Sequence, residues 1–301
     1  MIELRGLTKR FGATTAVDDL TCAFRPGLVT GFLGPNGAGK TTTMLMTLGL
    51  QRPTSGTALV AGKRYTDLPA PMREVGALLD ARATHPARTG HDHLLALALS
   101  NGLPRRRAGE VLERVGLSSV AGKRTGTYSL GMSQRLGIAG ALLGDPAILV
   151  LDEPINGLDP SGIAWVRNLM RGLAAEGRTV VVSSHLMSEM ELTADHLVVI
   201  GRGKLIADTS LEEFVAGSVP RDLVVRADDP HFAAKLRAEG ATVTEQPDGS
   251  LVVSGLDGHG VGRLALAQQV ILTELTPQRS SLEQVFMAMT EQSLEFEGGV
   301  R

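Results

Sequence analysis

The chain has 301 residues, and its 30 Lys and Arg nearly balance its 32 Asp and Glu, for a formal charge of −2. This balance excludes a strongly basic nucleic-acid-binding protein, and the single cysteine excludes an internal disulfide framework and a cysteine-ligated zinc site. The length suggests two domains, or one large domain with an appendage. No apolar run is long enough for a signal peptide or a membrane-spanning helix, so we expect a protein of a reducing compartment with no membrane segment.

Residues 1–217 alternate short apolar runs with amphipathic segments, a pattern typical of an α/β fold with a mainly parallel sheet. The sequence predicts strands at 28–33, 147–151 and 179–182, and helices that begin near Thr41 and that cover 94–99, 106–115, 133–143, 162–175 and 186–192. We therefore expect one α/β domain over 1–217.

A linker is predicted at Gly217 to Pro220, where the formal charge changes from +3 (23 − 20) over 1–219 to −5 (7 − 12) over 220–301. The tail predicts a small α+β domain over 220–301, with strands at 223–225, 241–243, 251–253 and 270–275 and helices at 232–238, 262–269 and 282–289. The sequence of this tail indicates no particular chemistry. The glycine-rich run 258–262 lacks the spacing of a dinucleotide fingerprint and is interpreted as a loop.

A glycine-rich segment that matches G-x-x-x-x-G-K-[ST] lies between a predicted strand and a predicted helix. Such a loop wraps a triphosphate with backbone N–H groups, and only glycines allow this close approach, while the lysine and the hydroxyl serve the phosphates and Mg²⁺. The residues predicted to bind a nucleotide here are Gly34, Pro35, Asn36, Gly37, Ala38, Gly39, Lys40, Thr41 and Thr42, with Thr41 also on the metal. A plain glycine-rich turn is the weaker interpretation.

Two further predicted strands end in polar residues that fit this chemistry. Asp152 and Glu153 follow the apolar run 148–151, at the end of a strand where an open α/β sheet places its ligands. Asp152 would hold Mg²⁺, and Glu153 would polarise a water for attack on the γ-phosphorus; the alternative is a solvated helix cap. His185 follows strand 179–182 and could orient the same water, although a lone histidine is more often structural.

The order and spacing of five motifs resemble the ATP-binding subunit of ABC transporters, and in particular the daunorubicin and bacitracin exporter type. These motifs are the segments 34–42, 128–135, 148–153, 157–159 and 184–185, and the segment 281–286 resembles the ending common in that subgroup. The resemblance implies that the first domain is α/β, with the P-loop NTPase fold of the ABC ATPase type and a helical subdomain. The small C-terminal α+β domain would follow it. It also implies that Glu153 is the general base and that His185 senses the γ-phosphate.

The same resemblance implies how two chains would share the nucleotide. Phe11 falls where these ATPases stack an aromatic ring on adenine, although a core phenylalanine at a strand end is the alternative. Ser129, Gly131 and Met132 fall on the signature segment, which caps the γ-phosphate held by the opposite protomer. Asp159 is similar to the acidic residue that crosses the dimer interface. Catalysis would then require a homodimer.

Two departures from the family pattern stand out. Leu130 and Met132 replace a glycine and a glutamine of the commoner signature, a change frequent in this exporter subgroup. Asp80 stands where a glutamine usually follows the stretch 75–79. Aspartate is shorter and charged, so we interpret Asp80 as a residue near Mg²⁺ and at the hinge to the membrane partner, without the neutral amide's bridge to water.

Other candidate sites have structural interpretations. His85, His91 and His93 do not have a metal-ligand spacing on a helix, and the arginines 105–107 open a polar helix whose charges are solvated. Cys22 is expected to be a small buried hydrophobe.

The function we predict is an ATPase that uses ATP and Mg²⁺ and energises export, of a drug or an antibiotic, through a separately encoded membrane permease. Such a subunit would be cytoplasmic and peripheral on the inner face of the plasma membrane, with no nucleic-acid partner. The alternative is a soluble ABC-type ATPase with a non-transport role, although one P-loop and the 89 residues between Lys40 and Ser129 (129 − 40) disfavour the tandem and coiled-coil forms. A non-hydrolysing regulatory module is disfavoured by Glu153 and His185.

Overall fold

The computed structural model describes residues 1–184, 186–216, 222–277, 282–283 and 286–287. The chain forms two compact units, Met1–Leu211 and Glu212–Arg301, and each is described by itself. The predicted linker 217–220 lies outside the described residues.

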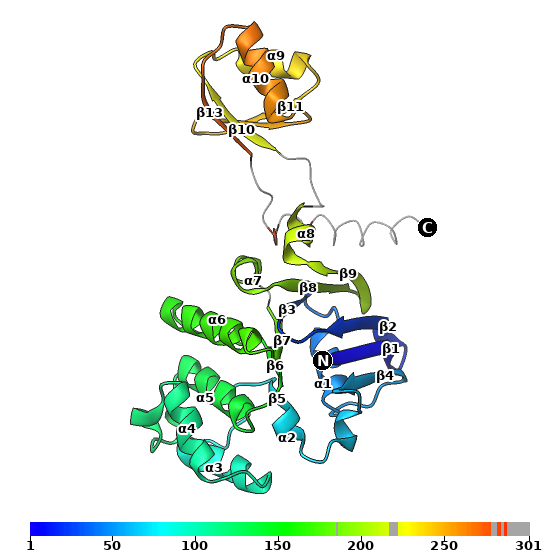
Figure 1. Ribbon diagram of the computed structural model, residues 1–301, viewed down its shortest axis with the longest axis vertical. Helices are drawn as coiled ribbons and strands as arrows, with labels where there is room; N and C mark the ends of the chain where they lie inside the picture. Colours follow the sequence, from blue (N-terminus) through cyan, green and yellow to red (C-terminus); the bar gives the residue numbers. More distant parts are fainter. Residues whose placement is uncertain (185, 217–221, 278–281, 284–285, 288–301) are drawn as a thin grey trace. The chain divides into compact units, whose positions relative to one another are not determined.

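A six-stranded sheet in the order β5-β6-β7-β3-β8-β9 forms the centre of the first unit (Figure 1). The first five strands are parallel, and β9 runs antiparallel to β8 at the edge. Their bounds are Val75–Leu78 (β5), Ile148–Asp152 (β6), Thr179–Ser183 (β7), Val29–Leu33 (β3), His196–Gly201 (β8) and Lys204–Ser210 (β9). Every residue of β3 and β7 is buried, which explains their continuous apolar sequences and confirms the predicted parallel sheet.

A second sheet, in the order β2-β1-β4, is antiparallel and was not predicted from the sequence. Its strands are Ile2–Phe11 (β1), Thr14–Phe24 (β2) and Ser55–Val60 (β4). Register shifts interrupt the pairing of β1 with both neighbours, so a strict alternation of apolar and polar residues is lost. One apolar core includes residues of both sheets, and Phe24 meets Phe32 edge to face at 5.6 Å between ring centroids.

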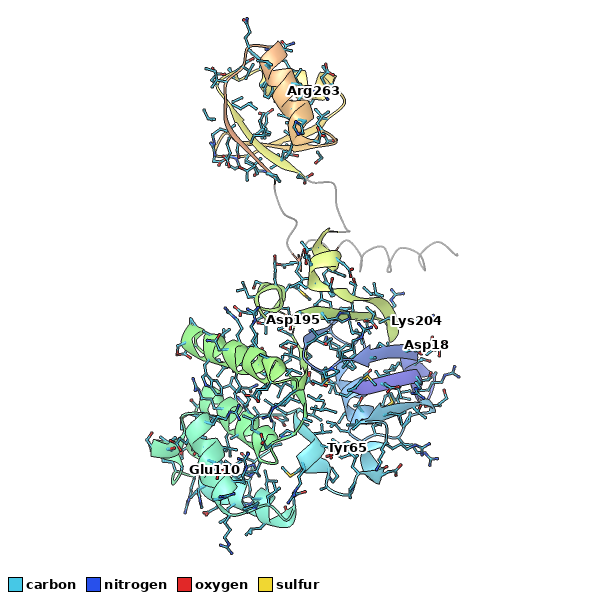
Figure 2. All side chains as sticks on the ribbon, viewed as in Figure 1. Asp18, Tyr65, Glu110, Asp195, Lys204 and Arg263 are labelled. Carbon is cyan, nitrogen blue, oxygen red and sulfur yellow. The ribbon has the colours of Figure 1, made fainter. Side chains whose placement is uncertain are left out.

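Polar contacts fix the strands that carry the site. The Asp195 carboxylate accepts a hydrogen bond from the backbone N–H of Val29 at 2.9 Å, so the start of β3 is anchored from the loop before β8. Asp18 of β2 and Lys204 of β9 form an ion pair at 3.5 Å, and Figure 2 shows both at one edge of this unit.

Helices cover the six-stranded sheet, and three of them gather in a separate group. The group consists of Gly90–Ser100 (α3), Arg106–Arg114 (α4) and Leu130–Leu142 (α5), which lie together in Figure 1 and correspond to the predicted helical subdomain. The remaining helices of this unit are Lys40–Thr47 (α1), Pro71–Glu74 (α2), Pro160–Ala175 (α6) and Met187–Thr193 (α7), and α8 covers Leu211–Ala216. Short 3₁₀ turns cover Tyr65–Asp67 (η1), Ser118–Val120 (η2) and Thr125–Thr127 (η3).

The second unit has the order β-α-β-β-α-β and a four-stranded antiparallel sheet arranged β11-β12-β10-β13. Its elements are Leu223–Ala227 (β10), Phe232–Ala238 (α9), Thr242–Glu245 (β11), Leu251–Ser254 (β12), Gly258–Ala267 (α10) and Leu272–Pro277 (β13). This topology is the ferredoxin-like split βαβ arrangement. Phe232, Leu236 and Val253 are fully buried, so the unit has an apolar core of its own.

The interpretation of 258–262 as a loop is wrong, because these residues form the first turns of α10. The Asp257 carboxylate caps the helix by accepting from the N–H of Gly260 at 2.7 Å, and this cap offsets the low helix propensity of the glycines. Of the predicted helix 282–289, the described residues 282–283 and 286–287 are helical.

Candidate functional site

The glycine-rich segment after β3 is a tight loop that leads directly into α1. The backbone of neighbouring strands approaches this loop closely. A Cβ atom at Gly34 would lie under 3.0 Å from the carbonyl oxygen of Ile200, and a Cβ atom at Gly39 would lie under 3.0 Å from the carbonyl oxygen of Ala16. Gly37 and Gly39 have φ angles of +82° and +103°, which L side chains rarely adopt. Glycine is therefore required at these positions for conformation, for space, or for both.

This loop lines a cavity of about 270 Å³. The residues around the cavity are Ala16, Asn36, Gly37, Ala38, Gly39, Lys40, Thr41, Thr42, Asp152 and Glu153. The structure thus brings the loop and the carboxylates at the end of β6 together, although more than a hundred residues separate them in the sequence. A cavity ringed by backbone N–H groups, one ammonium and two carboxylates suits a phosphate chain with a bound cation.

Lys40 extends along the inside of its own loop. Its Nζ donates hydrogen bonds to the carbonyl oxygens of Gly34 at 2.6 Å and of Pro35 at 3.2 Å. Burial lowers the pKa of the ammonium, while the nearby charges of Glu153 and Asp152 act in the opposite direction. The loop therefore places Lys40 Nζ beside the cavity.

Asp152 at the end of β6 is connected to both sides of the cavity. Its carboxylate accepts a hydrogen bond from Thr41 Oγ1 at 2.9 Å, and its other oxygen accepts a short one from Ser183 Oγ of β7. A hydroxyl and a carboxylate that already lie side by side are oxygen ligands of the kind that Mg²⁺ takes together with phosphate oxygens and water. Among the described residues no cluster of three or more His, Cys, Asp or Glu side chains could hold a metal ion.

Glu153 has a left-handed backbone, with φ of +50°. For a residue other than glycine this conformation costs about 1–3 kcal/mol and persists only where the surroundings hold it. The Glu153 N–H donates to Ser183 Oγ at 3.0 Å, and its carbonyl oxygen accepts from Gln134 Nε2 at 3.0 Å and from the N–H of Asn156 at 3.3 Å. Partners from β7 and α5 thus fix both backbone groups of this residue. Such strain at an acidic residue in a cavity is typical of a functional position.

The signature segment begins helix α5. Ser129 is the N-cap, and its hydroxyl accepts a hydrogen bond from the N–H of Met132 at 3.2 Å. Leu130 is 40% exposed, and a side chain at Gly157 would overlap it, so Leu130 packs directly on that glycine. Ser129, Gly131 and Met132 are not among the residues that line the phosphate cavity of the same chain.

Asp159 caps helix α6. Its carboxylate accepts from the N–H of Gly162 and from Ser161 Oγ, both at 2.9 Å, and these hydrogen bonds lower the pKa of the carboxyl group. The structure therefore gives Asp159 a capping role that the sequence analysis did not propose.

Three other predicted site residues lie apart from the cavity or outside the described residues. Phe11 ends β1 and is 47% exposed, which excludes a core phenylalanine, and Lys9 Nζ lies 5.0 Å from the ring centroid. Asp80 follows β5 and accepts from the N–H of Arg82 at 2.8 Å; it does not line the phosphate cavity. His185 lies outside the described residues.

Asp80 lines a second, more apolar hollow of about 390 Å³. Its lining comes from the helical group, from the region of β5, from the segment after α1 and from η1. The lining residues are Leu48, Leu50, Tyr65, Met72, Val75, Gly76, Ala77, Leu78, Leu79, Asp80, Ala81, Ala83, Thr84, His93, Leu97, Leu136, Gly137 and Gly140. Leu50, at 68% exposure, is the most exposed large apolar side chain of this set.

Sequence reasoning missed Ser183 and Gln134, which hold Asp152 and Glu153. Ser183 ends β7 and its partners are 30 and 31 residues away, so no local pattern pointed to it. The sequence does contain an indication of the role of Gln134. This glutamine is a buried polar residue on the same helix face as Ile138 and Ala141 at spacings of four and seven, where an apolar residue is expected.

The remaining candidates have structural environments. Arg107 donates to the carbonyl oxygens of Leu142 and Leu143, both at 3.0 Å, and so caps the end of α5. His91 lies in the first turn of α3 beside Asp92, at 3.6 Å. Cys22 is buried in the main core, and burial raises the pKa of its thiol to about 12.

The sequence matches a family described as "ABC transporter" over residues 17–156, and residues 221–283 match a domain of unknown function, DUF8746. The bacitracin transport ATP-binding protein BcrA of Bacillus licheniformis is 36% identical over 96% of this chain and 97% of its own. The daunorubicin/doxorubicin resistance ATP-binding protein DrrA of Streptomyces peucetius is 34% identical over 96% and 92%. A solved ATP-binding subunit of an ABC transporter is 27% identical, with a TM-score of 0.66 over 72% of this chain and 92% of that one. None of the described helices has the length and apolar character needed to cross a bilayer.

Proposed function

Since the chain belongs to the ATP-binding proteins of ABC transporters, we propose that it hydrolyses ATP to energise export through a separately encoded membrane permease. The observation that carries this proposal is the cavity in which the loop 34–42 faces Asp152 and Glu153. ATP hydrolysis is the usual activity of this family.

The phosphates of ATP would lie in the loop 34–42, where backbone N–H groups and the start of α1 favour negative charge. Lys40 would exchange its present carbonyl partners for β- and γ-phosphate oxygens. Thr41 and Asp152 would hold Mg²⁺, which neutralises charge that develops on the phosphates during transfer. Phe11 is exposed enough to stack on adenine.

Hydrolysis would proceed by attack of water on the γ-phosphorus, with formation of an oxygen–phosphorus bond and cleavage of the bond to the β-phosphate oxygen. Glu153 would accept the proton of that water, and ADP would leave with the bridging oxygen. The fixed backbone of Glu153 supports this role because a general base must be held within hydrogen-bond reach of the water. His185 would orient the water or contact the γ-phosphate.

Two chains would form the complete site. The signature residues Ser129, Gly131 and Met132 lie at the N-terminus of α5, where backbone N–H groups can meet an anion, and they do not line the cavity of their own chain. They would cap the γ-phosphate in the partner's loop, and Asp159 would lie at the interface. ATP would then favour a homodimer because it bridges the two chains.

The permease would dock on the hollow that Asp80 lines. This hollow is mostly apolar, joins the helical group to the region of β5, and bears the exposed Leu50 on its rim. A helix of a membrane protein that packed there could transmit closure of the dimer. Asp80 does not line the phosphate cavity, so its proposed role near Mg²⁺ would require that the segment after β5 approach the cavity when ATP binds. The subunit would be peripheral on the inner face of the plasma membrane.

The transported compound would be a drug or an antibiotic, because the relatives named for bacitracin and for daunorubicin cover most of this chain. The second unit, proposed as an accessory domain over 220–301 beside the ATPase domain over 1–217, would brace or regulate the dimer. The rival function is a soluble ABC-type ATPase with no transport role. A neighbouring gene for a protein with about six apolar helices would favour export, and its absence would favour the rival.

The direct test is phosphate release by the purified chain with ATP and Mg²⁺, compared with Lys40→Met and Glu153→Gln. We expect hydrolysis by the natural chain, loss of nucleotide binding in Lys40→Met, and retained binding with a rate at least about a hundredfold lower in Glu153→Gln. Full activity of Glu153→Gln would refute the assignment of the general base.

A further inference from the structure

Helix α5 has the signature segment at its N-terminus and, two residues beyond Met132, the buried side chain of Gln134. The Gln134 side chain is 3% exposed, and its amide donates from Nε2 to the backbone carbonyl of Glu153 at 3.0 Å. The acceptor is a carbonyl oxygen, so the nitrogen end of the amide must face it. One helix therefore carries both the segment offered to the partner's nucleotide and a hydrogen bond to the acidic residue of its own cavity.

The backbone at residue 153 depends on such contacts. Its φ of +50° is unfavourable for glutamate, and the direction of the Cα–Cβ bond follows from that backbone geometry. Ser183 holds the N–H, while Gln134 and the N–H of Asn156 hold the carbonyl. Gln134 belongs to another element, α5, whereas Asn156 lies three residues further along the same loop.

A second contact ties α5 to the same loop. The Leu130 side chain covers Gly157, where even a methyl group would overlap it. Helix α5 therefore contacts both ends of the segment 153–157, through a hydrogen bond at Glu153 and through an apolar contact at Gly157. A shift of α5 would therefore change the orientation of the Glu153 side chain.

We propose that Gln134 is a positioning residue for ATP hydrolysis. It fixes the orientation of the Glu153 carboxylate and couples that orientation to helix α5, which carries the signature segment. This inference rests on the proposed function, in which Glu153 is the general base. When the partner's ATP seats on the signature segment, α5 is fixed, and Gln134 fixes the carbonyl of Glu153 in turn. ATP bound in the partner's loop would thereby place Glu153 of this chain in position for hydrolysis.

The test uses Gln134→Met in the full-length chain, because methionine keeps the length and approximate volume of glutamine and removes the donor. We expect kcat to fall about 10- to 100-fold, as for a misplaced catalytic group, with the KM for ATP changed less than about threefold. The matched control is Gln268→Met, the same replacement at an exposed glutamine after α10, which should leave both constants unchanged. A normal kcat in Gln134→Met would overturn the inference.

A double-mutant cycle separates positioning from packing. If Gln134 acts through the Glu153 carboxylate, adding Gln134→Met to Glu153→Gln should change the single-turnover rate less than about twofold. Effects that multiply would show that Gln134 acts independently of Glu153 and would overturn the proposal. The proposed function is tested separately by Glu153→Gln alone, since a normal rate there removes the general base and with it the role of Gln134.

Folding of the variants is checked with Trp165, the single tryptophan of the chain, which lies 4.4 Å from the guanidinium of Arg135 on α5. Unchanged emission and melting temperature indicate that α5 is intact. If Gln134→Met does not fold, the cycle is repeated with Leu130→Ala, whose side chain is partly exposed and grips the same loop. A lower kcat that is not additive with Glu153→Gln is again expected, and a normal kcat or a multiplying effect would overturn the proposal.

Discussion

Replacement of Gly39 by alanine is expected to damage the phosphate-binding loop more than the same replacement at Gly37. Both glycines have positive φ angles, so alanine at either position is strained by about 1–2 kcal/mol. They differ in their surroundings: the Cβ at residue 37 would meet nothing within 4 Å, whereas the Cβ at residue 39 would come under 3.0 Å from the carbonyl oxygen of Ala16. Overpacking of this kind adds about 1–3 kcal/mol, and only at residue 39.

Thermal unfolding measures this difference. Since 1 kcal/mol shifts the melting temperature by about 2–4 °C in a domain of some 150–250 residues, Gly39→Ala should melt roughly 2–12 °C below Gly37→Ala. Relief of the overlap also moves the backbone N–H groups of the loop, so Gly39→Ala should bind ATP about tenfold more weakly than the natural chain or worse. Equal melting temperatures for the two variants would refute the reasoning from close approach.

Four further predictions follow from particular groups. The Cys22 thiol, buried and with its pKa raised to about 12, should not react with a disulfide reagent at pH 8 until urea unfolds the chain; rapid labelling of the native protein would contradict its placement. Asp159→Ala should lower the melting temperature at pH 7. Because the pKa of this carboxyl is lower in the folded chain, its stabilisation is present above the unfolded value of about 3.9 and is lost as the pH falls through the folded value, so the gap to the natural chain should close in acid. Asp80→Ala should raise the Mg²⁺ concentration for half-maximal hydrolysis about tenfold, and unchanged hydrolysis, Mg²⁺ dependence and transport would exclude a role near the metal. Deletion of 220–301 should weaken ATP-dependent dimerisation, and unchanged dimerisation, hydrolysis and resistance would leave the second unit without a role.

The strands that carry the site could be predicted because they are buried on both faces. Strands β3, β6 and β7 are continuous apolar runs, and the residues that follow β3 and β6 have the glycines and carboxylates that phosphate chemistry needs. The antiparallel sheet β2-β1-β4 could not be predicted, because register shifts along β1 remove the period of two. The strands and helices of the second unit could be predicted in outline. The start of α10 could not, because its glycines have low helix propensity and the Asp257 cap offsets that loss.

The supporting contacts of the site could not be predicted, because they join residues that are distant in sequence. Gln134 lies 19 residues from the carbonyl that it contacts, and Ser183 lies 30 from the N–H that it accepts from. The motifs identify the residues that would touch ATP, whereas the groups that hold those residues in place depend on how α5 and β7 pack beside β6.

We propose that two chains enclose ATP between the P-loop of one and the signature segment of the other, and that Glu153 ends this state by hydrolysis. The most direct measurement is the molar mass of Glu153→Gln by light scattering, with and without ATP and Mg²⁺. We predict the monomer mass of 31.7 kDa without nucleotide and twice that value with ATP, where hydrolysis is too slow to open the dimer. A monomer that binds ATP and hydrolyses it at the natural rate would contradict both the shared site and the general base.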